Sequence, residues 1–172
     1  HEILEQLHIE PAERVLVMGD GKLGLLIAMT LAQTGCALHV LGKHPEKLAL
    51  AQRIGARTWC APELPDERFD VVVEATGSAS GFDAALGFTR PRGRLVLKST
   101  YQGGLENMNT APLVIDEITL VGSRCGRFAP ALRSLASGRV DPAPLVQARF
   151  PLARAEEALT LAGQRGMLKV LL

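Results

Sequence analysis

A continuous apolar run leads directly into a glycine-rich turn near the start of the chain. Residues 15–18 are apolar throughout, which is typical of a strand buried on both faces of a parallel sheet. Residues 19–24 follow at once and match the pattern G-x-G-x-x-G. The residues that follow recur at the spacing of one helix face, namely Leu23, Leu26, Ile27, Thr30 and Leu31. Strand, glycine turn and helix in this order predict the first unit of an alternating β/α fold.

Each glycine of this turn has its own physical role if a dinucleotide binds there. Gly19 allows the tight turn out of the strand, Gly21 lets the backbone approach a pyrophosphate, and Gly24 lets the helix pack closely on the strand. Lys22 and Leu23 complete the loop, where free N–H groups at the helix N-terminus face the phosphates. The alternative is a turn without a ligand, but a second strand at the right distance favours nucleotide binding.

Composition excludes several other classes of protein. The chain has 172 residues, enough for one domain with a sizeable core, and 47% of them are hydrophobic, which argues against disorder. A net charge of +1 with scattered basic residues argues against nucleic-acid binding, and no apolar run approaches the ~20 residues of a membrane span. No signal peptide is recognised, and Cys36, Cys60 and Cys125 lie far apart, so we expect reduced thiols in the cytoplasm.

Alternating hydrophobic patterns predict an α/β fold with a doubly wound, six-stranded parallel sheet (Rossmann fold). Strands are expected at residues 15–18, 37–41, 58–60, 69–75, 94–98 and 117–121. Helices are expected at residues 2–9, from residue 23 to Gly35, and at 46–54, 80–89, 129–137 and 152–162. The whole chain, 1–172, is predicted to be one domain with a linker helix within 1–10 and a helix-strand tail at 146–172. In such a fold the ligand binds at the carboxyl ends of the strands.

The end of the second strand bears on the choice of cofactor. NAD sites place an acid there, about 20 residues after the glycine turn, to accept a hydrogen bond from the ribose 2′-OH. The equivalent residues here are Gly42, Lys43 and His44, none of which is acidic. Lys43 and a protonated His44 would pair with a 2′-phosphate. The alternative is that Lys43 is a solvated loop charge and His44 an ordinary residue that flanks a helix. We therefore predict NADP in preference to NAD.

Five segments taken together resemble the medium-chain dehydrogenase/reductase family, and most of all its zinc-dependent alcohol dehydrogenase branch. They read VLVMGDGKLGLL, HPEKLALAQRIGA, FDVVVEATGS, RPRGRLVLKSTY and ITLVGSR, and residues 150–172 are similar to the family's last helix and strand. The resemblance implies that residues 19–24 hold the pyrophosphate and residues 42–44 the adenosine ribose. It further implies that the adenosine side and the middle of the cofactor are bordered by Ala75, Thr76 and Gly77. The nicotinamide carboxamide would meet the backbone around Leu97, Lys98, Ser99, Val121, Gly122 and Ser123.

Members of this family carry a GroES-like catalytic domain with the catalytic zinc ligands before the region that this chain resembles. The resemblance therefore implies hydride transfer between NADP(H) and a small alcohol or carbonyl substrate, with zinc expected only in a catalytic domain outside these 172 residues. We expect the chain alone to bind the cofactor and to catalyse no reaction. The resemblance also implies that residues 146–172 pack on the catalytic domain and that the sixth strand joins two copies into a homodimer.

Other chemistry-bearing residues fit simpler structural roles. Cys36 and His39 lie at an odd spacing, and no second pair completes a zinc set, so both are expected to be packing residues. Glu74 is interpreted as a capped structural carboxylate rather than as a group that tunes the site. Lys98 is not expected to be catalytic. Tyr101 and Met108, in a polar loop at 99–110, are candidate substrate contacts.

Functions of other classes compete with the dehydrogenase hypothesis. A non-catalytic nucleotide-sensing or interaction module would use the same fold. An S-adenosylmethionine binder would also use a glycine-rich first turn, although the complete G-x-G-x-x-G argues against it. A short-chain dehydrogenase is excluded because the only tyrosine, Tyr101, is followed four residues later by Leu105 and not by lysine. A hydrolase is excluded because the sequence has no G-x-S-x-G elbow.

Overall fold

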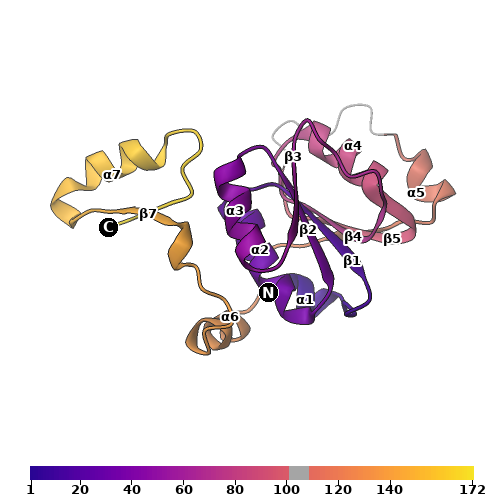
Figure 1. Cartoon of the computed structure of the whole chain (residues 1–172), viewed down its shortest axis with the longest axis horizontal. Helices are drawn as coiled ribbons and strands as arrows, with labels where there is room; N and C mark the ends of the chain where they lie inside the picture. Colours follow the sequence, from indigo (N-terminus) through magenta and orange to yellow (C-terminus); the bar gives the residue numbers. More distant parts are fainter. Residues whose placement is uncertain (101–108) are drawn as a thin grey trace.

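A six-stranded parallel sheet in the order β3-β2-β1-β4-β5-β6 forms the centre of the molecule (Figure 1). The computed structural model describes residues 1–100 and 109–172. The sheet consists of β1 (Arg14–Met18), β2 (Ala37–Gly42), β3 (Arg57–Cys60), β4 (Phe69–Glu74), β5 (Thr89–Leu97) and β6 (Thr119–Gly122). This is the strand order of the doubly wound dinucleotide-binding fold, so the predicted fold class is confirmed.

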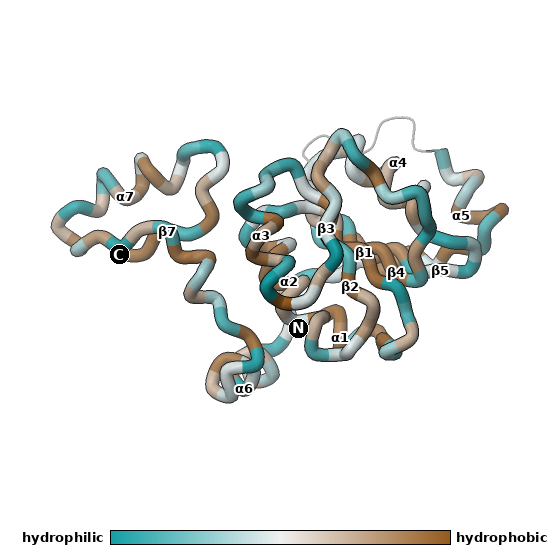
Figure 2. The backbone as a smooth tube through the Cα atoms, viewed as in Figure 1, coloured by the Kyte–Doolittle hydropathy of each residue, from teal (hydrophilic) through white to brown (hydrophobic). Residues whose placement is uncertain are grey.

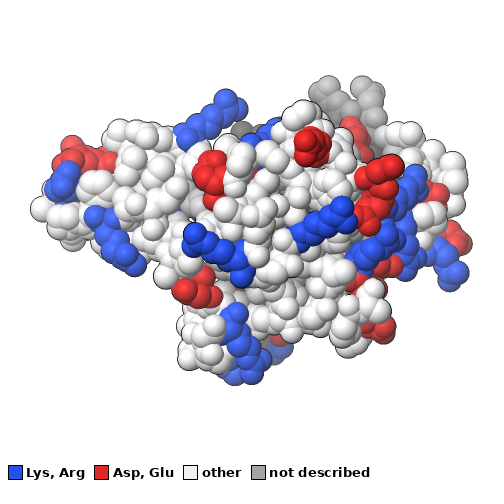
Figure 3. All heavy atoms as spheres, in the orientation of Figure 1, with Lys and Arg blue, Asp and Glu red and all other residues white. Residues whose placement is uncertain are grey.

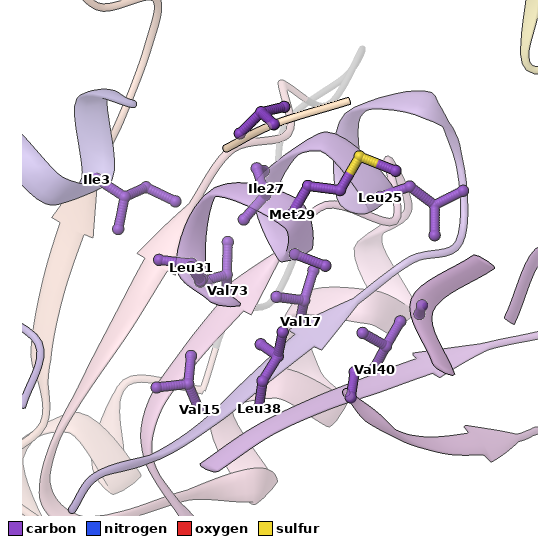
Figure 4. Close-up of a cluster of buried hydrophobic side chains, with 14 of the residues drawn as sticks. Ile3, Val15, Val17, Leu25, Ile27, Met29, Leu31, Leu38, Val40 and Val73 are labelled. Atoms are coloured by element: carbon purple, nitrogen blue, oxygen red, sulfur yellow. The ribbon is translucent and has the colours of Figure 1, made fainter. Parts of the chain in front are cut away.

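Side chains that alternate along β1 divide the core into two layers. Val15 and Val17 belong to a cluster with residues of α2 (Lys22–Leu31) and α3 (Pro45–Arg53), shown in Figure 4. Leu16 and Met18 belong to a second cluster with residues of α4 (Ala79–Phe88). None of the four side chains is more than 3% exposed. β1 is therefore buried on both faces, as its uninterrupted apolar run predicts.

Local sequence sets the ends of these helices. Pro45 occupies the first turn of α3, where its missing N–H has no partner to lose. The Ser78 hydroxyl caps α4 by accepting a hydrogen bond from the N–H of Gly81 at 3.2 Å. Gly35 ends the helical segment after β1 in the left-handed conformation, with a φ of +75°, which glycine adopts without strain.

The end of the chain extends away from the sheet. After α6 (Phe128–Ala136), β7 (Val146–Arg149) and β8 (Lys169–Leu171) form a separate two-stranded parallel sheet joined by α7 (Ala155–Ala162). Figure 1 shows this unit, in yellow, beside the main sheet and not within it. In Figure 2, hydrophobic residues lie both in the central strands and along α6 and α7. α6 and the tail therefore carry apolar surface that this chain leaves exposed, including Phe128 on α6 and Leu152 in the tail.

Several boundaries differ from those predicted. α1 (Glu2–Gln6) is shorter than the expected helix, β5 begins at Thr89 instead of Arg94, and β6 begins two residues late. Glu117 has a φ of +50°, so it cannot continue a strand. A short helix that the sequence did not predict, α5 (Ala111–Ile115), precedes β6. Tyr101 and Met108, the candidate substrate contacts, lie outside the described residues.

Paired charges hold the amino ends of the strands. Arg14 contacts Glu67 at 3.2 Å, Arg90 contacts Asp70 at 2.6 Å, and Figure 3 shows basic and acidic side chains side by side on the visible face. The amide N–H of Arg14 also donates to Asp70 at 2.8 Å. These charges are paired within the fold, so they stabilise the amino ends of the strands. The carboxyl ends of the strands are where a ligand binds in this fold class.

Candidate cofactor-binding site

The glycine turn lies at the carboxyl end of β1, in the middle of the sheet. Gly19 has a φ of +114°, and a Cβ atom there would stand 2.6 Å from the carbonyl oxygen of Ala75. A Cβ atom on Gly24 would overlap the carbonyl oxygen of Gly19. In contrast, a Cβ atom on Gly21 would meet no described atom within 4 Å. Gly19 and Gly24 are therefore required by the fold itself, whereas Gly21 faces open space that a ligand would fill.

The N-terminus of α2 begins at this open position. Gly21 is its N-cap, and no side chain in the described part of the molecule caps the helix. The first-turn N–H groups have no acceptor within the helix, and the helix dipole is positive at this end. Lys22 is exposed and Leu23 is 44% exposed on the same turn. This open backbone cradle fits a pyrophosphate, which is the group that a dinucleotide would bring here.

An aspartate that the sequence reasoning passed over lies between the glycine turn and the end of β2. Asp20 is 7% exposed. Its Oδ2 accepts hydrogen bonds from the backbone N–H groups of Lys43 and His44, each at 2.7 Å. The imidazole Nδ1 of His44 lies 3.0 Å from the same oxygen. Asp20 therefore ties together the two segments, 19–24 and 42–44, that were predicted to meet opposite ends of the adenosine diphosphate.

Burial favours the neutral form of Asp20, but the hydrogen bonds to its carboxylate outweigh burial. The N–H groups of Lys43 and His44, and then the His44 side chain, lower the pKa of Asp20 below its ordinary value. The prediction from sequence noted that residues 42–44 contain no acid. The structure places a carboxylate from another segment, that of Asp20, against these three residues. The signal was available as the Asp of Gly-Asp-Gly, but pattern matching treats this position as variable.

The segment after β4 also lies beside the glycine turn. Ala75 contacts the position of Gly19, as described above, and the N–H of Gly77 donates to the Ser99 hydroxyl at 2.9 Å. Thr76 turns inward, where its N–H and hydroxyl donate to Glu74 Oε1 at 2.7 and 2.5 Å. Glu74 is fully buried. Residues 75–77 and Ser99 therefore lie together, and Glu74 holds the turn in the way expected of a capped structural carboxylate.

A cavity of about 890 Å³ opens at the carboxyl ends of β5 and β6. Its walls include six of the predicted site residues: Leu23, Leu97, Lys98, Ser99, Gly122 and Ser123. Val121 is not among its lining residues and packs instead against the core. The walls are largely apolar, and they include residues of α1 and of the segment before α6.

Lys98 is a cationic residue in the wall of this cavity. Its Nζ donates to the Ser123 hydroxyl at 3.2 Å and to the carbonyl oxygen of Arg124 at 2.5 Å. Burial lowers the pKa of Lys98 from its ordinary value, and Cys125 and Glu2 oppose that shift. Lys98 therefore joins the ends of β5 and β6, which shapes the cavity wall.

The remaining predicted packing residues lie as expected. His39 is buried with its ring centroid 5.0 Å from that of Phe69, and Cys36 is half-buried against the core. Within residues 1–100 and 109–172, no group of three or more His, Cys, Asp or Glu side chains is placed to hold a metal ion. The described residues therefore provide no donor set for zinc. None of the helices described is both long and apolar enough to cross a membrane.

Strand order, glycine turn and open cradle together define a doubly wound domain of the dinucleotide-binding type. The pattern that describes the zinc-binding dehydrogenase family matches residues 23–137. The match covers well over half of the chain, so the chain belongs to the zinc-binding dehydrogenases. The resemblance to zinc-dependent medium-chain dehydrogenases is thereby confirmed, and the chain corresponds to the NAD(P)-binding domain of that family.

Individual relatives agree with this assignment. L-idonate 5-dehydrogenase (NAD(P)(+)) of Escherichia coli strain K12 is 32% identical over 164 residues, which are 89% of this chain and 48% of the relative. Sorbitol dehydrogenase of Homo sapiens is 31% identical over 178 residues, or 92% and 49% of the two chains. Alcohol dehydrogenase TADH from Thermus sp. ATN1 superposes with a TM-score of 0.89 at 27% identity, covering 99% of this chain and 54% of that one. The chain spans about half the length of the curated relatives it matches.

Proposed function

We propose that this chain holds NADP(H) for hydride transfer in an alcohol dehydrogenase-like oxidoreductase. The observation that carries the proposal is the open backbone cradle at Gly21, in front of the uncapped N-terminus of α2. The pyrophosphate would bind at residues 19–24, and residues 75–77 would border the middle of the cofactor. The nicotinamide would enter the cavity beside Lys98, where backbone at 97–99 and 121–123 would meet its carboxamide.

The preference for NADP rests on the end of β2. Lys43 is exposed, and its ammonium forms no ion pair with any residue in the described ranges. A 2′-phosphate would find this cation and the His44 imidazole beside it. The relative L-idonate 5-dehydrogenase is named for both cofactors, NAD and NADP. Membership of the family therefore does not select one cofactor, and local residues such as these would select it.

When bound, the nicotinamide supplies the hydride chemistry, and the residues of this chain bind and orient it. No residue described here is assigned a catalytic role. The relatives are named for the oxidation of idonate and sorbitol, which supports a small alcohol or carbonyl compound as the substrate of the whole protein. Zinc, with its ligands, would belong to a catalytic domain on which the tail formed by residues 146–172 would pack.

Assembly and location follow from the same proposal. β6 lies at the edge of the sheet, and Leu120 on it is 40% exposed, so a second copy paired along this edge would cover apolar surface. Leu120→Lys should then shift the sedimentation coefficient from dimer to monomer, and a wild-type chain that is monomeric at every concentration contradicts the homodimer. The three cysteines are free thiols, which suits the reducing cytoplasm.

Titration with NADPH and NADH, followed by Trp59 or cofactor fluorescence, tests the proposal. Tighter binding of NADPH supports the cofactor preference, and Lys43→Asp should then reverse it. Tighter binding of NADH contradicts the assignment of residues 42–44 as a 2′-phosphate site. Gly21→Ala is the matched test of the cradle, because its added methyl meets no protein atom yet stands where the pyrophosphate would lie. The proposal fails if neither dinucleotide binds.

A further inference from the structure

We propose that Asp20 is a specificity-determining residue, which shapes residues 42–44 into a receptor for the 2′-phosphate of NADP and excludes an NAD-type acid from position 42. The inference rests on the proposed function and deepens it. It assigns the cofactor choice to a residue of the glycine turn, which lies 23 positions before Lys43 in the sequence.

The first step of the argument is steric. A Cβ atom on Gly42 would stand 2.5 Å from Asp20 Oδ2 and 2.6 Å from Asp20 Cβ. Both distances are below what non-bonded atoms tolerate, and Asp20 Cβ is fixed to the backbone of the turn. The Asp20 side chain therefore occupies the volume that an acidic side chain at position 42 would need. As long as Asp20 is present, the NAD-type arrangement has no room at this position.

The second step concerns what the Asp20 carboxylate still offers to a ligand. Oδ2 accepts the two backbone N–H groups of Lys43 and His44, and both oxygens lie within 3.1 Å of His44 Nδ1. With 7% exposure, the residue is buried within the protein. A carboxylate used in this way has little capacity to accept from a ribose 2′-OH. Asp20 therefore does not replace the acid of an NAD site, although it lies nearby.

The third step concerns the side chains of the turn. Both backbone N–H groups point toward Asp20, which fixes the backbone conformation in which Lys43 remains exposed. His44 is held through Nδ1, so its Nε2 is left for another partner. Asp20 thus fixes the backbone from which Lys43 projects and the position of the His44 imidazole. A lysine ammonium that projects from a fixed backbone favours a phosphate over a hydroxyl group.

The test compares 2′,5′-ADP with 5′-AMP, which differ only in the 2′-phosphate, by calorimetric titration of the 172-residue chain. We expect wild type to bind 2′,5′-ADP more tightly. Asp20→Asn should lower the affinity for 2′,5′-ADP by about fivefold or more, as expected for lost charged hydrogen bonds, and change that for 5′-AMP less than about twofold. Asp83→Asn is the matched control, since it removes an equal charge from the exposed face of α4 and should change neither affinity.

Other outcomes overturn the inference. If Asp20→Asn weakens 5′-AMP and NADH but strengthens 2′,5′-ADP, Asp20 accepts from the ribose as an NAD-type acid. An unchanged ratio of the two affinities also contradicts a role in specificity. Should Asp20→Asn fail to fold, Gly42→Ala displaces the Asp20 carboxylate without altering any charge and should lower the same ratio. If wild type binds neither nucleotide nor NADPH, the proposed function itself fails, which is distinct from the loss of discrimination alone.

Discussion

Asp20 and Gly42 share one volume, because Oδ2 of the aspartate lies 2.5 Å from the place that a Cβ atom of residue 42 would take. The two residues belong to different β/α turns, after β1 and β2, and meet because these strands are neighbours in the sheet. Met18 pairs with Leu41, so both strands end at the same level. A substitution at either residue should therefore change how the side chain at the other position packs.

Exchange of the two side chains should move the cofactor preference toward NADH. In Asp20→Ala/Gly42→Asp, the volume freed at position 20 accommodates an acid at the end of β2, where it can accept from a ribose 2′-OH and repel a 2′-phosphate. We expect the ratio of NADPH to NADH affinity to fall by about tenfold or more. Fluorescence titration measures it. Gly42→Asp alone should bind both cofactors poorly, and a single variant as selective as the double one would contradict the shared-volume argument.

Gly42→Ala should destabilise the native state by about 1–3 kcal/mol, since overpacking against the Asp20 side chain costs that much. Asp20→Ala should remove most of this penalty when it is combined with Gly42→Ala. Urea denaturation of the four proteins in the cycle gives the coupling free energy. Additive effects of the two substitutions would show that the residues do not interfere with one another.

The glycines of the turn should separate into structural and ligand-facing positions. Gly24→Ala forces a methyl group into the Gly19 carbonyl oxygen, so we expect a loss of about 2 kcal/mol or more in the free energy of unfolding. Gly21→Ala should cost less than about 1 kcal/mol, because its Cβ atom has open space. It should nevertheless weaken NADPH binding at least about tenfold. Thermal or urea unfolding and a binding titration of both variants test this separation.

The buried His39 should make stability depend on pH near neutrality. Burial, followed by the charges of Arg57 and Arg14, lowers the pKa of His39, and Glu67 only partly opposes them. The unfolded chain then binds a proton that the native chain does not, so this contribution is full above about pH 6.5 and is lost as the pH falls through the lowered folded value.

The measurement is urea denaturation at several pH values between about 5 and 7.5. The free energy of unfolding should fall on acidification in wild type, and the fall should be smaller in His39→Phe, which keeps the aromatic contact with Phe69. His8→Gln, at an exposed histidine, is the control and should behave as wild type. Equal pH dependence in wild type and His39→Phe would rule out this histidine as the source.

Lys98→Met should affect the nicotinamide half of the cofactor alone. The substitution removes the hydrogen bonds from Nζ to the Ser123 hydroxyl and the Arg124 carbonyl oxygen, which hold the cavity wall. We expect NADPH affinity to fall by about threefold to tenfold, while 2′,5′-ADP, which lacks the nicotinamide, binds as before. Calorimetric titration with both ligands distinguishes the two halves, and a matching loss for 2′,5′-ADP would contradict this placement.

The sequence predicted best what depends on neighbouring residues. The apolar run of β1, the glycine turn and the start of α2 form one continuous segment, so periodicity and turn chemistry suffice. The predicted start of β5 was five residues late, because Pro91 and Gly93 normally disfavour a strand. In the sheet, the register between β4 and β5 shifts after Phe69 pairs with Thr89, and this irregularity accommodates both residues. Only the pairing partner reveals such a shift.

The amino-acid sequence by itself determined the β/α alternation, the doubly wound class and the glycine cradle, because each is encoded by local spacing. That residues 42–44 select the cofactor stays a prediction from the sequence. Tertiary structure alone decided how that segment is built. The Asp20 carboxylate reaches the N–H groups of Lys43 and His44 because β1 and β2 are adjacent strands whose ends align. Hydrogen bonds between residues so distant along the chain depend on strand pairing, which no local pattern of residues specifies.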